Sequence, residues 1–388
     1  MHKPLIDAAR PRVLLSCSAG PVDHPATWSG TPHNLLHALQ KDGQLVPEVR
    51  LLGESRAVSL ASRIDNRLGW AHPSVRGPGY RIAQGLRVQT AAQAADCRAT
   101  LHFGSYDLPW TGQRMPAYLY IDTSLELWIR QAVAAQGLSS AQRRWFHRFE
   151  RHALTRAEHI FTVGQHVAAN VIEQFGVAPE RVTAIGTGRG TIRPYNGPKD
   201  YAAGRLLTVA KVRPHDKGLP LLLDAFAIAR QTRPELTLTV VGGAKFPGIE
   251  NHPGVRGTGW IEAEELQQIY EQSTLFVMPA MYEPWGLAYI EALACRTPVM
   301  GFNRNALPEI SDHGRFGFLT DQLDAAGFAT ALLDALLQPE RLAQMGAAGQ
   351  VDCLRRYSWE QTAGALAGRI CADLQQRASQ RRERSAQA

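Results

Sequence analysis

The sequence predicts an α/β protein made of two doubly wound domains, each a parallel sheet covered by helices. Short apolar runs alternate with longer stretches of helical periodicity along most of the chain, a pattern typical of βαβ units. One glycine- and proline-rich segment, residues 187–198, interrupts this alternation, and we interpret it as the linker between the domains. The chain has 388 residues and is 45% hydrophobic, which is enough to form two cores.

The charge balance favours anionic ligands over nucleic acid. The chain has 42 Lys+Arg against 35 Asp+Glu, a formal net charge of +7. Neither zinc-ligand spacing nor an RNA-binding aromatic motif nor a helix-turn-helix signal accompanies this charge, so we expect no nucleic-acid partner. An anionic ligand or an anionic membrane surface fits the charge as well. Part of the excess lies near the C-terminus, in four arginines beside one glutamate: Arg377, Arg381, Arg382, Arg384 and Glu383.

Cysteine use and hydropathy predict the compartment. Five cysteines are scattered without paired spacing, which indicates reduced thiols rather than a disulfide framework. Residues 1–7 lack the long apolar core of a signal peptide. The sequence also has no run of about 18 apolar residues, the length that a membrane-spanning helix needs. We expect a cytoplasmic protein with at most a peripheral contact at the inner membrane surface.

The first predicted domain opens with an apolar strand at residues 12–17, a loop that contains Gly30, and a helix that starts near Pro32. A strand, a glycine loop and a helix in this order often bind phosphate, which makes Gly30 a candidate contact. The alternative is a plain loop with a helix cap. The remaining strands and helices predicted for this domain lie at residues 46–52, 100–103, 117–121, 159–163 and 181–185 for strands and at 139–155 and 165–175 for helices.

Two segments of this domain carry weaker patterns. Residues 54–98 are rich in turn residues, and we expect a long irregular loop there. The helix at residues 139–155 is amphipathic, and its periodicity predicts that Trp145, Phe149 and Leu154 face the core.

Polar residues follow two predicted core strands at the sheet edge where open α/β sheets bind ligands. Asp122 comes directly after the strand at residues 117–121, which makes it a candidate ligand contact. The alternative is that Asp122 caps the helix that follows. His102 lies at the end of the preceding strand, and we expect a packed histidine there rather than a catalyst.

The second predicted domain repeats the alternation of strands and helices. Three helices follow the sheet, and we expect the basic end of the chain beyond residue 377 to fray. The predicted strands lie at residues 205–210, 236–241, 275–278, 298–300 and 316–319, with a further short strand and its loop at 255–261. The predicted helices lie at 219–230, 262–272, from 286 onward, 324–337, 339–357 and 359–376.

A pair of glutamates brackets one helix start in this domain. Glu283 lies in a loop after a buried strand, a helix begins near Gly286, and Glu291 falls about one and a half turns inside it. The first amides of a helix attract anions, so a diphosphate on Gly286, Leu287 and Ala288 would have acids on both sides for hydroxyl groups. That arrangement suits a nucleotide sugar. The alternative is a buried strand and an ordinary helix, where the dipole alone favours a glutamate.

Cations cluster at the first strand of the same domain. The strand at residues 205–210 runs into Lys211, Arg213 and Lys217-Gly218, and a helix follows. Two or three cations between a strand end and a helix start can clamp a diphosphate. A solvated basic loop is the alternative.

The acidic string resembles a motif of the retaining glycosyltransferases of family 4, also called glycosyl transferase group 1. The similar residues run from Glu-Pro-Trp-Gly-Leu at Glu283 to Glu-Ala-Leu-Ala-Cys at Glu291. Trp285 stands where the family has Phe, and Arg296 where it has Gly. Lys217-Gly218 also matches the family pattern, whereas an arginine is usual at the position of Lys211.

The resemblance implies the GT-B architecture, with the donor between two doubly wound domains. It implies that Glu283 binds the donor hexose, that Glu291 binds the ribose, and that Lys211 and Lys217 hold the diphosphate. Arg213 would compensate for the lysine at position 211, because lysine cannot form a bidentate fork. The remaining implied contacts are Gly30 with the diphosphate, Ile261 with the base, and Asp122, where many members have histidine, with the hexose or the acceptor hydroxyl.

The implied domains are residues 1–190 on the acceptor side, 200–357 for the donor, a helix at 358–376 that crosses back, and a flexible basic tail at 377–388. The implied reaction transfers a hexosyl unit from a nucleotide-diphosphate sugar to a carbohydrate or lipid-linked glycan acceptor, with retention, in glycan, polysaccharide or glycolipid biosynthesis. No metal or other cofactor is expected. A GT-B nucleotide-sugar epimerase and a non-catalytic nucleotide-sugar-binding protein are the alternatives.

Overall fold

A computed structural model describes residues 10–50, 52, 55–110, 113–243 and 246–387 of the chain. The prediction made for residues 1–7 lies outside these ranges. The chain divides into two compact units, and each is described by itself. Unit 1 combines the residues up to Leu127 with Gly137–Gly188 and the residues from Trp359 onward. Unit 2 combines Trp128–Gln136 with Arg189–Ser358.

Unit 1 is built on a six-stranded parallel sheet with the strand order β2-β1-β3-β4-β5-β6. The strand order reverses between β1 and β3. The chain adds β2 on one side of β1, then crosses to the other side and adds β3 to β6 toward the opposite edge. Every residue of β3 and β4 is buried, as expected for strands covered on both faces. The strands are β1 (Arg12–Cys17), β2 (Val46–Val49), β3 (Ala99–Phe103), β4 (Ala117–Ile121), β5 (His159–Thr162) and β6 (Val182–Ala184).

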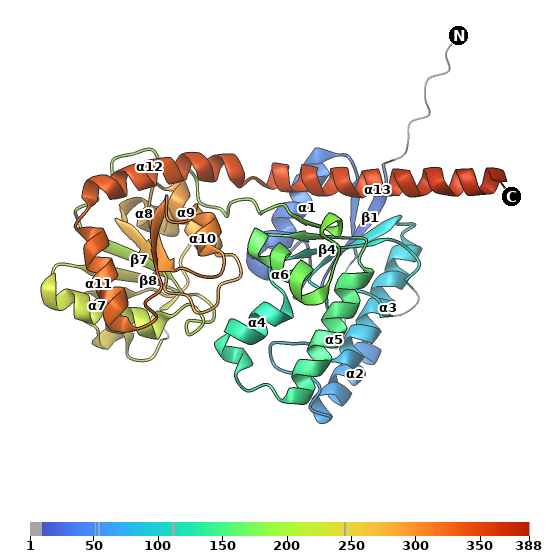
Figure 1. Ribbon diagram of the computed structural model, residues 1–388, viewed down its shortest axis with the longest axis horizontal. Helices are drawn as coiled ribbons and strands as arrows, with labels where there is room; N and C mark the ends of the chain where they lie inside the picture. The colour runs from blue at the N-terminus through green and yellow to red at the C-terminus, as the bar shows by residue number, and fades with distance from the viewer. Residues whose placement is uncertain (1–9, 51, 53–54, 111–112, 244–245, 388) are drawn as a thin grey trace, which may run out of the picture. The chain divides into compact units, whose positions relative to one another are not determined.

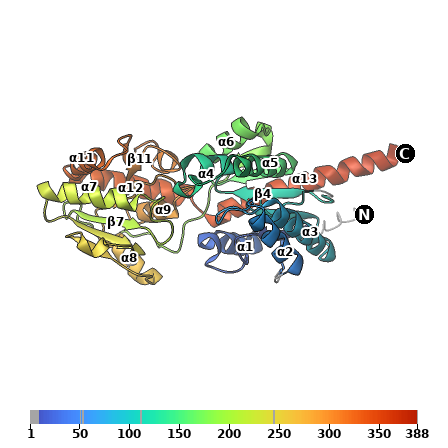
Figure 2. The ribbon, with the colours of Figure 1, turned by 90° about the horizontal axis from the view of Figure 1, so that it is seen from below.

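Helices cover both faces of this sheet. Figure 1 shows α1 and α13 on one side and α3 and α5 on the other, and Figure 2 shows α13 passing behind β4. The helical elements before the linker are η1 (Thr27–Gly30), α1 (Thr31–Asp42), α2 (Arg56–Arg67), α3 (Pro78–Ala94), α4 (Leu125–Gln131), η2 (Val133–Ala135), α5 (Ser140–Arg156), α6 (Gln165–Phe175) and η3 (Pro179–Arg181), and α13 (Trp359–Gln387) ends the chain.

The prediction of a long irregular loop at residues 54–98 is wrong. The segment folds into α2 and α3, which pack on each other. Ser55 caps α2 by accepting a hydrogen bond from the Val58 amide at 3.5 Å. The buried carboxylate of Asp65 accepts from the amides of Gly79 at 2.9 Å and Tyr80 at 2.8 Å, which joins α2 to the start of α3. The glycines and prolines therefore mark the helix ends rather than a loop.

Two further expectations for unit 1 need correction. The basic end of the chain does not fray at residue 377, because α13 continues to Gln387. Its last turns are rich in Arg, Gln and Ala, which are good helix formers, and Arg377 forms an ion pair with Glu158. On α5, Trp145 is 36% exposed, and the neighbouring Phe146 is buried in its place.

Unit 2 has a second six-stranded parallel sheet, with the order β12-β11-β10-β7-β8-β9. The strand order reverses between β7 and β10. The chain adds β8 and β9 on one side of β7, and then β10, β11 and β12 on the other side. Loops at the carboxyl ends of two such strands diverge, which leaves room for a ligand. The strands are β7 (Arg205–Val209), β8 (Thr237–Val241), β9 (Val255–Gly257), β10 (Leu275–Val277), β11 (Val299–Phe302) and β12 (Gly317–Thr320).

The helices of unit 2 pack a large apolar core against this sheet. Helices α7 and α11 pack together, and both are labelled at the edge of this unit in Figure 1. Leu222, Phe226 and Leu332 on these helices are fully buried in the core. The predicted class, two doubly wound α/β domains, is confirmed in both units. The helical elements are α7 (Leu219–Thr232), η5 (Ile249–Asn251), α8 (Ala263–Gln272), α9 (Leu287–Ala294), α10 (Leu307–Ile310), α11 (Ala325–Leu336) and α12 (Pro339–Arg356).

Two classes of feature are missing from the described ranges. Among those residues, no helix is both long and apolar enough to cross a membrane. Within the same ranges, no three side chains of His, Cys, Asp or Glu are grouped so that they could hold a metal ion. All five cysteines are thiols, and burial raises the pKa of Cys295 and of Cys353 to about 12.

Candidate functional site

The loop after β7 is fixed against the loop after β10 by backbone geometry. Gly218 caps α7 with a left-handed φ of 71°, and a Cβ at this position would overlap the carbonyl oxygen of Pro279. The Lys217 amide donates to the carbonyl of Arg213 at 3.1 Å, and Arg213 itself has a positive φ of 53°. The loop that carries the predicted cations is therefore fixed next to β10, at the point where the strand order of the sheet reverses.

Lys217 and Glu283 lie together at this point. The Lys217 Nζ is 3.4 Å from Oε2 of Glu283, and both side chains are largely buried, at 20% and 15% exposure. Lys217 also donates to the carbonyl of Val209 at 3.3 Å, which directs its side chain back over the end of β7. One predicted cation and one predicted acid, from adjacent strands, thus form an ion pair.

Lys211 lies on the other side of the β7 loop. Burial lowers the pKa of Lys211, with Glu291 acting to raise it and Lys217 to lower it further. Its Nζ is 4.6 Å from the centre of the Trp260 ring, a cation–π contact. A Cβ at Gly242 would be 2.5 Å from the Lys211 Cα, so this tight approach requires glycine.

Two contacts position the carboxylate of Glu291, which lies on α9. The Tyr270 hydroxyl donates to its Oε2 at 2.9 Å, and burial keeps that phenol protonated by raising its pKa well above the ordinary value. A Cβ at Gly190 would overlap Oε1, so the linker backbone lies directly against the carboxylate. Burial raises the pKa of Glu291, while the hydrogen bond from Tyr270 and the charges of Lys211 and Lys217 act to lower it.

The start of α9 presents its first amides between the two glutamates. Gly286 precedes the helix with a left-handed φ of 85°, and a Cβ there would be 2.5 Å from the Tyr289 ring. The Tyr289 hydroxyl donates to the carbonyl of Met278 at 2.9 Å, which anchors the helix to the end of β10. The amides of Leu287 and Ala288 have no acceptor within the helix, because they belong to its first turn.

One predicted contact of unit 2 lies farther along the sheet, and another lies exposed in the β7 loop. Ile261 follows β9, two strands away from β7, and its neighbour Trp260 reaches Lys211. Arg213 is exposed at the tip of the β7 loop. Sequence reasoning missed Trp260, although an aromatic residue next to the predicted contact Ile261 was a signal that could have identified it. The roles of Tyr270 and Gly190 have no signal in the sequence, because both depend on side chains far apart along the chain.

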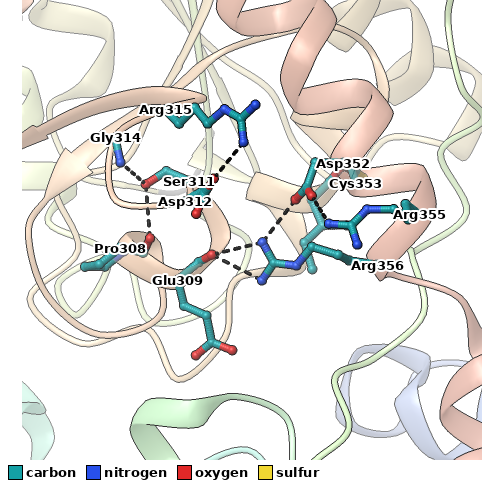
Figure 3. A network of polar contacts seen from close by, with 11 residues as sticks. Pro308, Glu309, Ser311, Asp312, Gly314, Arg315, Asp352, Cys353, Arg355 and Arg356 are labelled. Carbon is teal, nitrogen blue, oxygen red and sulfur yellow. Dashed lines mark hydrogen bonds and ion pairs between the residues drawn. The ribbon is translucent and has the colours of Figure 1, made fainter.

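A polar network supports the loop after β11 in the same unit (Figure 3). Arg356 donates from both terminal nitrogens to the carbonyl of Glu309, at 3.2 Å each, and pairs with Asp352 at 3.0 Å. Figure 3 shows the Glu309 side chain pointing away from this guanidinium. Asn305 in that loop has a positive φ of 57°, and its Nδ2 donates to the carbonyl of Met281 at 3.4 Å. Asn305 thus takes a left-handed turn, a conformation that asparagine tolerates better than most residues.

The predicted residues of unit 1 form a separate group. The Trp28 indole donates to Oδ2 of Asp122 at 2.8 Å, which ties the loop after β1 to the end of β4. Trp28 and Ser29 both have positive φ, 46° and 55°, and Gly30 follows with 82° before α1 begins. The cap of α4 comes from Ser124, whose hydroxyl accepts from the Leu127 amide at 3.1 Å. Trp28 was missed, although it stands two residues before Gly30.

His102 is a packed histidine, as expected. Its Nδ1 lies 3.1 Å from Oδ1 of Asp107, and its Nε2 lies 2.9 Å from the Thr100 hydroxyl. Both His102 and Asp107 are fully buried, so the imidazole ring of His102 packs in the core of unit 1.

Two doubly wound units define the class of protein as GT-B. Over nearly its whole length the chain has the fold of solved glycosyltransferase-type structures. It matches sucrose-phosphate synthase from Thermosynechococcus elongatus with a TM-score of 0.68 and 18% identity, over 94% of this chain and 99% of that one. It matches the Anabaena protein HepE in complex with UDP and glucose with a TM-score of 0.63 and 15% identity, over 94% and 100%.

The sequence of unit 2 resembles a known family. Residues 203–338 match the family described as glycosyl transferases group 1. A curated relative, the D-inositol 3-phosphate glycosyltransferase of Gordonia bronchialis, is 26% identical over 56% of this chain and 53% of its own length. The chain thus spans about half the length of the curated relatives it matches. The family resemblance predicted from the acidic motif is confirmed.

Proposed function

We propose that this chain is a glycosyltransferase that transfers a hexosyl unit from a nucleotide-diphosphate sugar to an acceptor hydroxyl, with retention at the anomeric carbon. The observation that carries the proposal is the Lys217–Glu283 ion pair at 3.4 Å, next to Lys211 and Glu291, where the strand order of the unit 2 sheet reverses. Cations and acids together suit a ligand that has both phosphates and hydroxyl groups. The family match of this unit supports the same function, as does the UDP bound to HepE.

The cations and amides serve the departing diphosphate. As the glycosidic bond to phosphate breaks, negative charge grows on the leaving oxygen. Lys211, Lys217 and the amides of Leu287 and Ala288 stabilise that charge from fixed positions, which lowers the barrier without reorganisation of solvent. Arg213 adds a guanidinium that can bind phosphate in bidentate fashion, which lysine cannot do.

The acids serve the hydroxyl groups of the donor. Glu283 binds the hexose beside the diphosphate, because its partner Lys217 belongs to the phosphate clamp. Glu291 binds the ribose, and its fixed position between Tyr270 and Gly190 supports this role. Ile261 lies in the loop that reads the base through backbone groups.

Retention follows from attack on the face that the diphosphate leaves. The bond between the anomeric carbon and the phosphate oxygen breaks, a bond to the acceptor oxygen forms on the same face, and the acceptor proton passes to the leaving phosphate. This route needs neither a covalent enzyme intermediate nor a metal or other cofactor. In unit 1, Gly30 approaches the diphosphate and Asp122, oriented by Trp28, binds the hexose or the acceptor hydroxyl.

The biological setting belongs to the same proposal. The acceptor is a carbohydrate or a lipid-linked glycan, and the product enters glycan, polysaccharide or glycolipid biosynthesis. The place is the cytoplasm, with peripheral contact at the inner membrane surface. Five cysteines present as thiols support a reducing compartment.

The test begins with a panel of nucleotide sugars in a thermal-shift screen, since a ligand of the folded state raises the melting midpoint. The donor that binds is then assayed for transfer and for hydrolysis. We expect Glu283→Ala to bind the nucleoside diphosphate normally and to lose turnover. Failure of every donor in the panel to bind, transfer or hydrolyse contradicts the proposal. Epimerised donor carrying label from isotopic water would assign an epimerase instead, and binding without any turnover a non-catalytic protein.

A further inference from the structure

One acid in the loop after β7 has no part in the proposed function. Asp216 lies directly before Lys217, and it is only 3% exposed. Much of the loop around it is exposed, with Val212 at 67%. Because burial of a carboxylate without hydrogen bonds is costly, the partners of Asp216 indicate why it is held inside.

The side chain of Asp216 caps a helical turn that lies 83 residues earlier in the chain. The Val133 amide donates to its Oδ1 at 2.8 Å. Val133 is the first residue of η2, and the preceding Ala132 provides no side-chain cap. Asp216 thus supplies the acceptor that a first-turn amide lacks within its own helix.

The capped turn belongs to a short segment that leaves one unit and then returns to it. Trp128–Gln136 is part of unit 2, although the chain up to Leu127 and again from Gly137 is part of unit 1. Trp128 and Ala135 within the segment are buried. The bond from Val133 therefore fixes this segment to the loop that carries Lys217.

The backbone of Asp216 makes a second connection. Its carbonyl accepts from the Tyr282 amide at 3.0 Å, which joins the loop after β7 to the loop after β10. Tyr282 directly precedes Glu283, just as Asp216 directly precedes Lys217. The residues of the 3.4 Å ion pair thus each follow a residue that takes part in this backbone bond.

We propose that Asp216 is a positioning residue of the donor site, and that its bond to Val133 fixes Lys217 and Glu283 relative to each other. The inference rests on the proposed function, because it assigns a supporting residue for that reaction. The side chain holds the β7 loop from one side, and the carbonyl holds Tyr282 from the other. Without the side-chain bond, Lys217 shifts from the position at which it stabilises the leaving diphosphate.

Two pairs of substitutions isolate this hydrogen bond. Asp216→Ala removes the acceptor, whereas Asp216→Asn keeps an oxygen at the position of Oδ1. Val133→Pro removes the donor, whereas Val133→Ala keeps the amide and shortens only the side chain. Proline suits the first position of a helical turn, and the extended ψ of 134° at Ala132 is compatible with a proline that follows. Asp224→Ala, at an exposed acid of α7, is the general control.

The test measures kcat/KM for the donor at a temperature where denaturant titration shows each variant to be folded. Asp216→Ala and Val133→Pro should each lower kcat/KM roughly tenfold, because both displace a group that stabilises the transition state. Asp216→Asn should stay within about threefold of the wild type, since it keeps the acceptor. Asp224→Ala should match the wild type.

A double variant tests whether the two groups act through the same bond. Asp216→Ala combined with Val133→Pro should lose no more than either change alone, because the second change has no bond left to remove. Val133→Pro should also lose more than Val133→Ala, since only the former lacks the amide hydrogen.

Three results overturn the inference. The first is a loss of stability in Asp216→Ala with unchanged kcat/KM of the folded protein, which would make the residue structural alone. The second is an equal loss in Asp216→Asn and Asp216→Ala, and the third is additive losses in the double variant. A wild type that turns over a donor and variants that do so equally well keep the proposed function and lose only this inference. A wild type that binds and turns over no donor loses both.

Discussion

Both sheets have polar residues in the loops that follow their strands, but the charges of these residues differ between the two units. In unit 2 cations and acids lie together after β7 and β10: Lys217 forms an ion pair with Glu283, and the charge of Glu291 acts on Lys211. In unit 1 the loops after β1 and β2 surround a pocket with arginines and, in its described lining, no carboxylate. A mixed site suits a ligand with phosphates and hydroxyls. The same supersecondary architecture thus carries two different arrangements of charge.

The backbone conformations of the loops also differ between the two units. Unit 2 uses glycine where its site elements approach closely, at Gly190, Gly218 and Gly242. The loop after β1 in unit 1 instead holds Trp28 and Ser29 in left-handed conformations, stabilised by the bond from Trp28 to Asp122. Close approach leaves little room for substitution in unit 2, and we expect its variants to show the largest effects.

The largest effect is expected for Glu283→Gln. The change removes the charge that pairs with Lys217 and, in the proposed function, the group that accepts a hydrogen bond from a hexose hydroxyl, so kcat should fall by about 10²–10³-fold. Steady-state transfer kinetics with the identified donor measure this loss. Glu265→Gln, an exposed acid on α8, is the matched control and should retain kcat. Equal kcat values for the two variants would contradict a role of Glu283 in the reaction.

Gly218→Ala should destabilise the protein by about 2 kcal/mol or more. The position has a φ of 71°, and the added methyl would overlap the Pro279 carbonyl oxygen. Denaturant titration of wild type and variant gives the difference in unfolding free energy. Gly259→Ala serves as control, because no atom lies within 4 Å of the added methyl there. A stable Gly218→Ala protein would contradict the close packing of the two loops.

Tyr270→Phe should raise the KM for the donor roughly tenfold, with a smaller change in kcat. It removes the 2.9 Å hydrogen bond that positions Glu291, a contact to a charged group. The same bond acts to lower the pKa of Glu291, which burial raises. The role proposed for Glu291 requires the ionised acid, so the loss of donor binding at low pH should begin at a higher pH in the variant. An unchanged pH profile of 1/KM would show that Tyr270 does not act through Glu291.

Unit 1 should show a pH effect on stability rather than on binding. Burial raises the pKa of Glu150 to about 7, against 4.5 for the ordinary carboxyl group. Between these values the native state binds more protons than the unfolded state, so stability should fall as the pH rises through that window. Glu150→Gln should flatten this part of the profile of unfolding free energy against pH. A wild-type profile that rises with pH across the same window would contradict the assignment.

The sequence was sufficient for most of the fold because the strands are continuous apolar runs and the helices keep their periodicity. It failed at residues 54–98, where capping by Ser55 and Asp65 turned apparent breakers into helix ends. It failed again beyond residue 377, where local helix propensity continued α13. In the site, the motif residues were found because they are close in sequence. Tyr270 and Gly190 were not, because their contacts with Glu291 exist only after folding.

The central claim is that the cations of unit 2 bind the diphosphate of a nucleotide donor, and calorimetric titration tests it most directly. UDP, GDP and ADP are titrated into the wild type, Lys217→Gln and Arg256→Gln, the last an exposed cation of the same sheet. We expect one nucleotide to bind the wild type and Arg256→Gln with similar affinity, and Lys217→Gln roughly tenfold more weakly. Equal affinity of all three proteins for that nucleotide would contradict the claim.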